Sequence, residues 1–396
     1  MSLPIFGQTP ATPAPYGMPW LRLAFRPFYL GAALLSALIV PLWVAIFLGA
    51  TTWLPTPPAL LWHAHEMLFG FAIAVIVGFL MTAGKTWTGL ATPRGPLLGL
   101  LFLLWLSARV ASVVAPYAVF AVLDLALLPL IGLIFLRLLI RSRNWRNMPL
   151  ALILLLLSLV NLTFHLSATG TINLAPMNSL YAGLGFIVMI ECVIAGRVLP
   201  FFTATALNLK IEPLVWLERS TLAAVALGLL LWVTGWHSGL AAAALALASV
   251  LNLWRQLRWH PLATLQRPIL WILHFSYLWL SLGFALLAMA QIGWLPTSVG
   301  VHALAVGATG GLIVGMMTRT SRGHTGRALQ VDRLEVVAYV LIMLAAVLRV
   351  LLPLLMPAWY AFFLMASATA WSAAFLIFLW RYTPWLVTTR TDGKDG

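Results

Sequence analysis

The chain has 396 residues, of which 62% are hydrophobic and only 8% are charged. Ordinary soluble domains carry roughly 25% charged residues, so this composition excludes a water-soluble enzyme and predicts an all-α membrane protein. Lys and Arg outnumber Asp and Glu by 23 to 9. In a soluble protein such an excess suggests nucleic acid, but here the basic residues lie in short loops between apolar runs. We therefore expect a lipid bilayer as partner and no nucleic acid.

Twelve apolar runs have about the 20 residues that a helix needs to cross a bilayer. They cover residues 27–49, 58–83, 96–115, 118–140, 149–167, 178–200, 220–236, 239–256, 268–290, 298–318, 334–353 and 357–380. The runs predict one transmembrane domain over residues 21–382. A flexible N-terminal tail (1–20) precedes it and a cytoplasmic C-terminal tail (383–396) follows it. The single cysteine, Cys192, excludes an internal disulfide.

The loop charges predict the orientation. Of the 23 Lys and Arg residues, 21 lie in the tails and in loops on one side of the predicted membrane, and the loops on the other side carry none. Cytoplasmic loops are the ones enriched in Lys and Arg. We therefore expect both termini in the cytoplasm.

The second and tenth runs contain related sequences. His65, Gly70 and Gly78 recur as His302, Gly307 and Gly315, and Thr88-Gly89 recurs as Thr325-Gly326, all at an offset of 237 residues. The first four helices therefore correspond to the last four, whereas a middle unit shows only traces at an offset of 118. We expect three repeat units, at about 21–148, 149–260 and 261–382, arranged as three four-helix arcs around a pseudo-threefold axis. The alternative is chance similarity among leucine-rich helices.

Histidines supply most of the candidate ligands. His63 and His65 open the second helix. Side chains at positions i and i+2 of a regular helix diverge by roughly 200°, so these two histidines suit different partners. His302 is the repeat equivalent of His65, and two imidazoles at matched depth can ligate one haem iron from opposite faces. His165 is a metal ligand or an interfacial residue. Any single one of these histidines could instead form a hydrogen bond between helices.

Other polar residues are weaker candidates. His274 lies on the same face of its helix as Tyr277, and His324 lies in the basic loop 319–327, as a ligand, a phosphate-type contact or a solvated side chain. Glu191 is a carboxyl within the sixth helix, and such a group relays protons or is held neutral by a hydrogen bond. We expect catalytic roles for Glu191 and Tyr277.

Arg109 and Arg349 are the two basic residues that lie inside helices, at repeat-equivalent positions. The arginine guanidinium binds carboxylates through two parallel hydrogen bonds, and haem carries two propionates. Both arginines are therefore candidates to hold a haem. The alternative is an ion pair with Glu66 or Asp124.

Several motifs resemble the NnrS family. They are Arg26 to Phe28, Trp62 to Phe71, Gly78 to Leu80, Trp87 to Gly89, Gly196 to Thr203, His274, Met316 to Arg319 and Gly323 to Arg327, and the resemblance covers residues 20 to 382. The segment before Trp87 departs from the pattern, because it lacks a proline-containing turn. The resemblance implies a bacterial inner-membrane protein with haem and copper that takes part in nitric oxide metabolism and in tolerance of nitrosative stress.

The expected plan of three arcs, with haem-binding histidines on the second and tenth helices, is similar to the haem–copper oxidase catalytic subunit, whose superfamily includes nitric oxide reductases. The sixth helix here lacks histidine, so that superfamily's copper or non-haem iron site is absent from its usual position. Any second metal must use other histidines.

The sequence thus predicts a membrane protein that binds nitric oxide or reduces it to nitrous oxide with electrons from an unknown donor. His65 and His302 are the expected axial ligands of a haem b. His63, with His165 or His274, is the expected copper site, because imidazole suits copper. The alternatives are a proton-coupled secondary transporter, since repeats are typical of transporters, and a sensor of metal or nitric oxide without turnover.

Overall fold

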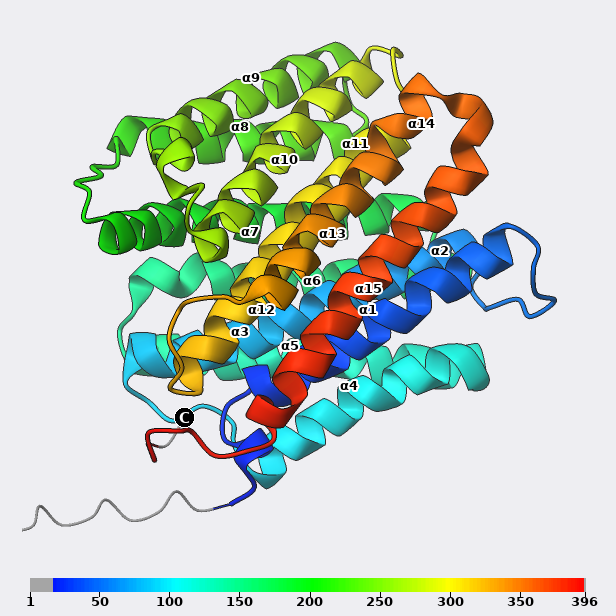
Figure 1. Ribbon diagram of the computed structural model, residues 1–396. Helices are drawn as coiled ribbons and strands as arrows, with labels where there is room; N and C mark the ends of the chain where they lie inside the picture. The colour runs from blue at the N-terminus through cyan, green and yellow to red at the C-terminus, as the bar shows by residue number, and fades with distance from the viewer. Residues whose placement is uncertain (1–16, 395–396) are drawn as a thin grey trace, which may run out of the picture.

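The computed structural model describes residues 17–394, and within them the chain is entirely helical, with twelve helices long and apolar enough to span a membrane (Figure 1). Ten of these spans consist of one long helix, in some cases with a short helical turn at one end. They are α1 (Phe25–Phe47), α4 (Pro96–Val114), α5 (Tyr117–Arg141), α6 (Met148–Ala168), α7 (Pro176–Leu207), α8 (Val215–Thr234), α9 (Ser238–Leu257), α10 (Pro268–Gln291), α13 (Arg333–Val350) and α15 (Tyr360–Leu386). The predicted class, an all-α membrane protein, is confirmed.

The other two spans are each built from three consecutive segments. The second span consists of α2 (Ala59–His65), the π-helical segment η2 (Glu66–Ala72) and α3 (Ile73–Thr88). The tenth span consists of α11 (Thr297–His302), the π-helical segment η5 (Ala303–Gly310) and α12 (Gly311–His324). Each π segment begins directly after a repeat-related histidine. Because π segments are rare and occur frequently at functional sites, these two mark where the function is expected.

Successive helices pack against one another around the bundle, and α15 packs against α1 so that the two ends of the chain meet. The second span is the most deeply buried, and α7, which is the sixth span, contacts both interrupted spans. The second, sixth and tenth spans are the second helices of the three predicted units. These three helices therefore lie against one another, and the division of the chain into three arcs stays a prediction.

Short elements connect the spans and close the ends. They are the 3-10 turns η1 (Pro19–Leu21), η3 (Trp145–Asn147), η4 (Pro261–Thr264) and η6 (Pro357–Trp359) and the short helix α14 (Leu352–Leu355). Helix α15 continues to Leu386, beyond the predicted start of the C-terminal tail, because Arg26 Nη1 holds its end through the carbonyls of Leu386 (3.0 Å) and Thr388 (2.7 Å). Most of the predicted N-terminal tail, residues 1–16, lies outside the described residues.

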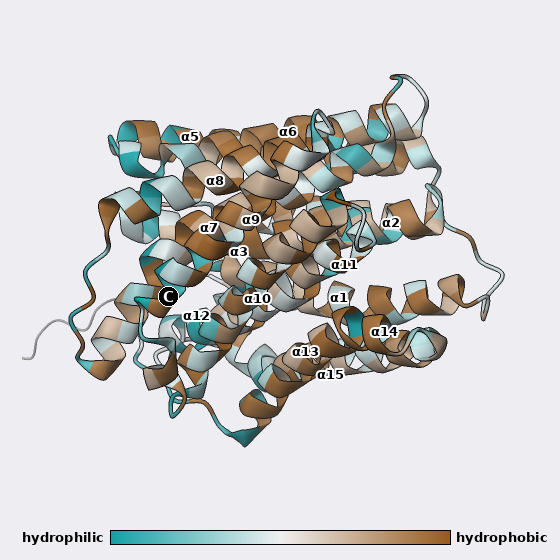
Figure 2. Ribbon diagram, turned by 90° about the horizontal axis from the view of Figure 1, so that it is seen from above, coloured by the Kyte–Doolittle hydropathy of each residue, from teal (hydrophilic) through white to brown (hydrophobic). Residues whose placement is uncertain are grey.

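The helices are coloured mostly as hydrophobic along their lengths, and hydrophilic residues gather toward the two ends of the bundle (Figure 2). Large hydrophobic side chains such as Leu100, Leu230 and Trp380 are exposed, where a soluble protein would carry charge. This surface fits the hydrocarbon of a bilayer, and the chain is a multi-pass membrane protein.

Candidate functional site

The two histidines of the motif at the start of the second span face different environments, as their spacing predicts. The His63 ring stacks on Trp43, with ring centroids 4.2 Å apart, and lines a large cavity. The His65 ring is fully buried on the other side of the helix, against Phe164 and His165. The motif therefore serves two sites, which we call the cavity site and the triad site.

The cavity site is a cavity of about 310 Å³ between the two interrupted spans. His63, His302 and Arg349 line it together with apolar and aromatic side chains, among them Trp43, Met67, Phe71, Met177, Tyr360 and Trp371. A mostly apolar cavity with a few convergent polar groups is the usual form of a small-molecule or cofactor site.

Hydrogen bonds set which nitrogen of His302 can act as a ligand. Its Nδ1 lies 2.6 Å from the carbonyl oxygen of Ser298, to which it donates. The other nitrogen, Nε2, then carries a lone pair and accepts from Arg349 Nη2 at 3.2 Å. On His63, Nδ1 is buried and makes no hydrogen bond to a protein group. His302 Nε2 is thus a nitrogen with a lone pair, and the His63 ring lines the same cavity.

Arg349 is a half-buried cation without an acidic partner among the described residues. Its contacts are His302 Nε2 and the ring of Tyr360, whose centroid lies 5.7 Å from the guanidinium carbon. The offset of 237 that relates His65 to His302 places Ala303 where the first repeat has Glu66. The last repeat has therefore lost the carboxylate that would neutralise its arginine, and the cavity is left with an unpaired positive charge.

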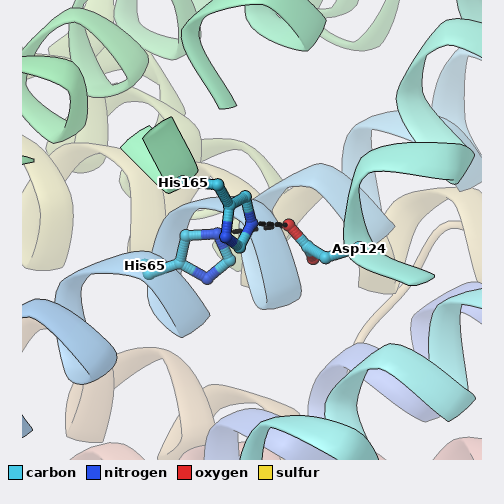
Figure 3. A group of neighbouring side chains, drawn as sticks. All are labelled: His65, Asp124 and His165. Atoms are coloured by element: carbon cyan, nitrogen blue, oxygen red, sulfur yellow. Dashed lines mark hydrogen bonds and ion pairs between the residues drawn. The ribbon is translucent and has the colours of Figure 1, made fainter. Parts of the chain in front are cut away.

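The triad site consists of His65, Asp124 and His165, from three different spans (Figure 3). Asp124 Oδ2 lies 3.2 Å from Nε2 of His65 and 3.2 Å from Nε2 of His165. One ligand atom from each residue lies within 4.8 Å of the others, and all three side chains are buried. This is the spacing of a three-ligand metal site.

The second nitrogen of each ring in the triad site is also engaged. His65 Nδ1 lies 3.2 Å from Glu66 Oε1, and His165 Nδ1 lies 2.9 Å from the Tyr117 hydroxyl. Metal-binding histidines almost always have such an outer partner, which fixes the ring and leaves the other nitrogen for the metal. The residue types and their spacing therefore fit a metal ion, which would replace the proton that His65 Nε2 donates to Asn161 Oδ1.

Asn161 and Arg109 complete the triad site. Asn161 bridges the ligands, because its Oδ1 lies 3.0 Å from His65 Nε2 and its Nδ2 donates to Asp124 Oδ2 at 2.6 Å. Arg109 donates to Glu66 Oε1 at 2.5 Å and to Asp124 Oδ1. Two carboxylates face one guanidinium, so the site keeps one negative charge that a bound cation would balance.

The structure does not bring His65 and His302 together, although the sequence predicted them as axial ligands of one haem. Each points toward the arginine of its own repeat, His65 toward the group that contains Arg109 and His302 toward Arg349. The ring that shares a cavity with His302 belongs to His63 instead. Arg109 forms ion pairs with both Glu66 and Asp124, which is the alternative that the sequence offered to a haem propionate.

The other candidates lie elsewhere. Tyr277 contacts Arg255 and Asn252 and lines neither the cavity site nor the triad site. His274 Nε2 lies 2.9 Å from the Thr203 hydroxyl, away from both predicted copper partners. The ring of His324 lies against Phe25, where Arg390 binds its carbonyl. Glu191 lines a second, smaller cavity.

The sequence predicted Glu66 and Asp124 only as partners of an arginine. It did not predict Asp124 as a potential metal ligand or Tyr117 as the partner of His165. Asp124 could have been found, because an acidic residue inside an apolar helix is a functional candidate by default. Tyr117 carries no such signal in a single sequence.

Comparison with known proteins agrees with these observations. No curated protein matched the chain. A model of the NnrS protein family matches residues 19–390, which is nearly the whole chain and includes every residue of both sites. The chain therefore belongs to the NnrS family and is a membrane protein of the nitric oxide response.

Proposed function

We propose that this protein binds nitric oxide at a haem in the cavity site and carries a second metal, copper, in the triad site. The observation that carries the proposal is the division of the two motif histidines. His63 shares an apolar cavity with His302 and an unpaired arginine, while His65 joins a buried cluster with metal-ligand spacing.

The donor set of the cavity site fits a haem b. His63 and His302 each offer an imidazole nitrogen, and imidazole is a common axial ligand of haem iron. The apolar and aromatic lining suits the porphyrin faces, and Arg349 is the cation available for a propionate. A haem bound there would supply the iron that takes up nitric oxide.

The two histidines of the cavity site would be held by different contacts. His302 Nε2 lies 3.2 Å from Arg349 Nη2, whereas the His63 ring stacks on Trp43. Trp43 would therefore orient His63, and Arg349 would orient His302, toward a haem bound in the cavity.

The triad site suits a transition metal ion. Two imidazole nitrogens and one carboxylate oxygen bind iron, copper or zinc, and the resemblance to the family favours copper. Arg109, Asn161, Glu66 and Tyr117 would orient the three ligands.

The experiment is spectroscopy and elemental analysis of the purified protein. We expect a Soret band, a change in that band when nitric oxide is added under anaerobic conditions, and copper bound in addition to haem iron. His165→Ala should remove the copper and keep the haem. His237, which lies in a loop, provides the matched control, and His237→Ala should change neither. A colourless protein with no bound metal would contradict the proposal and favour a transporter.

A further inference from the structure

A second cavity of about 90 Å³ lies between α1, α3, α7 and α12 and adjoins the cavity site. Ala72 and Thr309, the last residue of η2 and the next-to-last of η5, line both cavities. Most of the second cavity's lining is apolar, for example Ile76, Phe79 and Met316. Only three polar side chains face it.

These three polar side chains are Tyr29, Glu191 and Thr309. The Tyr29 hydroxyl, Glu191 Oε2 and the Thr309 hydroxyl are all buried. Tyr29 interacts with Thr320, and Glu191 interacts with Thr309, but among the described residues none of the three atoms has a short, well-aligned hydrogen bond. A buried polar atom that is poorly satisfied is destabilising. Buried polar groups of this kind are commonly satisfied by ordered water.

The cavity has room for that water. One water needs about 15 Å³ of such space, and this cavity offers about 90 Å³. The Thr309 hydroxyl interacts with the Glu191 carboxyl. Because Thr309 also lines the cavity site, it lies between Glu191 and that site. At the other end, Thr320 lies beside the Tyr29 hydroxyl, next to the basic residue Arg319.

We propose that Tyr29, Glu191 and Thr309 line a hydrated path that carries protons from the end of the bundle with the basic loops to the cavity site. The path begins at Thr320 and Tyr29, crosses the second cavity through water, and reaches the cavity site at Glu191 and Thr309. This inference rests on the proposed haem. When one electron reduces a ferric haem, the site gains a negative charge, and one proton that this path delivers from bulk water to a haem propionate would compensate for it.

The first experiment tests the water and needs no haem. Radiolytic hydroxyl-radical labelling modifies side chains that contact water, and it is applied to the full chain in lipid nanodiscs. Met316 lines the second cavity, and its neighbour Met317 is fully buried and does not. We expect Met316 to be oxidised about tenfold faster than Met317, because oxidation of methionine follows its accessibility. Equal rates would overturn the inference.

The second experiment tests the proton path in vesicles that enclose a pH dye and contain haem-loaded protein with its basic loops inside. A photoexcited flavin in the outer medium, with a sacrificial amine as electron donor, reduces the haem. We expect one proton per haem to leave the lumen, about 100-fold more slowly in Glu191→Gln than in the wild type, with partial rescue by Glu191→Asp. Ser281→Ala should change nothing, because the Ser281 hydroxyl is also buried and unpartnered but lines neither cavity.

The results separate the two proposals. Absence of a Soret band in the wild type would defeat the proposed haem. A normal Soret band with proton uptake that Glu191→Gln leaves unchanged, or with no proton uptake in the wild type, would defeat the proton path alone.

Discussion

The two repeat-related arginines should respond in opposite ways when each is replaced by leucine. Arg109→Leu leaves the Glu66 and Asp124 side chains, which are 0% and 3% exposed, without their cation. Removing one partner of a buried ion pair costs about 3–5 kcal/mol, because the other charge stays buried and unpaired. We therefore expect the haem-free Arg109→Leu protein to lose about that much free energy of unfolding.

Arg349→Leu removes a cation that has no carboxylate to leave behind. A guanidinium inside a membrane helix costs about 2.5–3.5 kcal/mol, and the lost hydrogen bond to His302 Nε2 is worth about 1 kcal/mol. The haem-free Arg349→Leu protein should therefore be as stable as the wild type or more stable, by up to about 2 kcal/mol. Its haem affinity should fall, since a propionate would lose its partner.

Denaturant titration of the haem-free variants in detergent measures both stabilities, and the Soret absorbance after reconstitution measures haem affinity. A triple variant, Arg109→Leu with Glu66→Gln and Asp124→Asn, is the control, because it removes the two charges as well and should recover most of the lost stability. Equal destabilisation by the two leucine variants would refute the assignment of Arg109 to an ion pair and Arg349 to a ligand.

Three further predictions follow from particular contacts. Tyr117→Phe removes the partner of His165 Nδ1, so copper affinity should fall about 10- to 100-fold while haem content stays constant. Elemental analysis would measure the copper and absorbance the haem, and an unchanged copper affinity would contradict the role of Tyr117. Gly70→Ala places a Cβ 2.9 Å from Leu35 Cδ2 and 3.0 Å from Arg109 Nη1, so it should lower the free energy of unfolding by about 1–3 kcal/mol. The control Gly99→Ala has its nearest contact at 3.5 Å and should be neutral. A neutral Gly70→Ala in the same denaturant titration would contradict the close packing of Arg109. A reporter enzyme active only in the periplasm and fused after Gly396 should be inactive, because the basic loops predict a cytoplasmic C-terminus; an active reporter would contradict that orientation.

Much of the fold could be predicted from the sequence, because membrane spans depend on length and hydropathy alone. Most of the twelve helices begin and end within a few residues of their apolar runs. The ends at Thr88, His324 and Leu386 lie beyond the runs, since polar and basic residues at the membrane surface continue a helix without adding hydrophobicity. Helix α7 also continues past its run, to Leu207. The offset between His65 and His302 also predicted corresponding positions, and both residues precede a π segment.

The partners of the site residues could not be predicted in the same way. A helical repeat relates backbone positions, but each side chain's partner depends on residues from other spans. His65 and His302 are equivalent in position, yet Glu66 and Asp124 draw His65 into a compact polar cluster, while Ala303 leaves His302 beside a cavity. The spacing of His63 and His65 did predict two separate partners, because that inference depends only on the geometry of one helix.

The most direct test of the account compares three alanine variants by their haem content per protein. His63→Ala and His302→Ala should each lower the Soret absorbance or change its position, because both rings line the cavity site. His65→Ala should keep the haem and lose the copper, because its ring lies in the triad site. Loss of haem in His65→Ala together with full haem in His63→Ala would contradict the central claim that His63, and not His65, faces His302 across the haem.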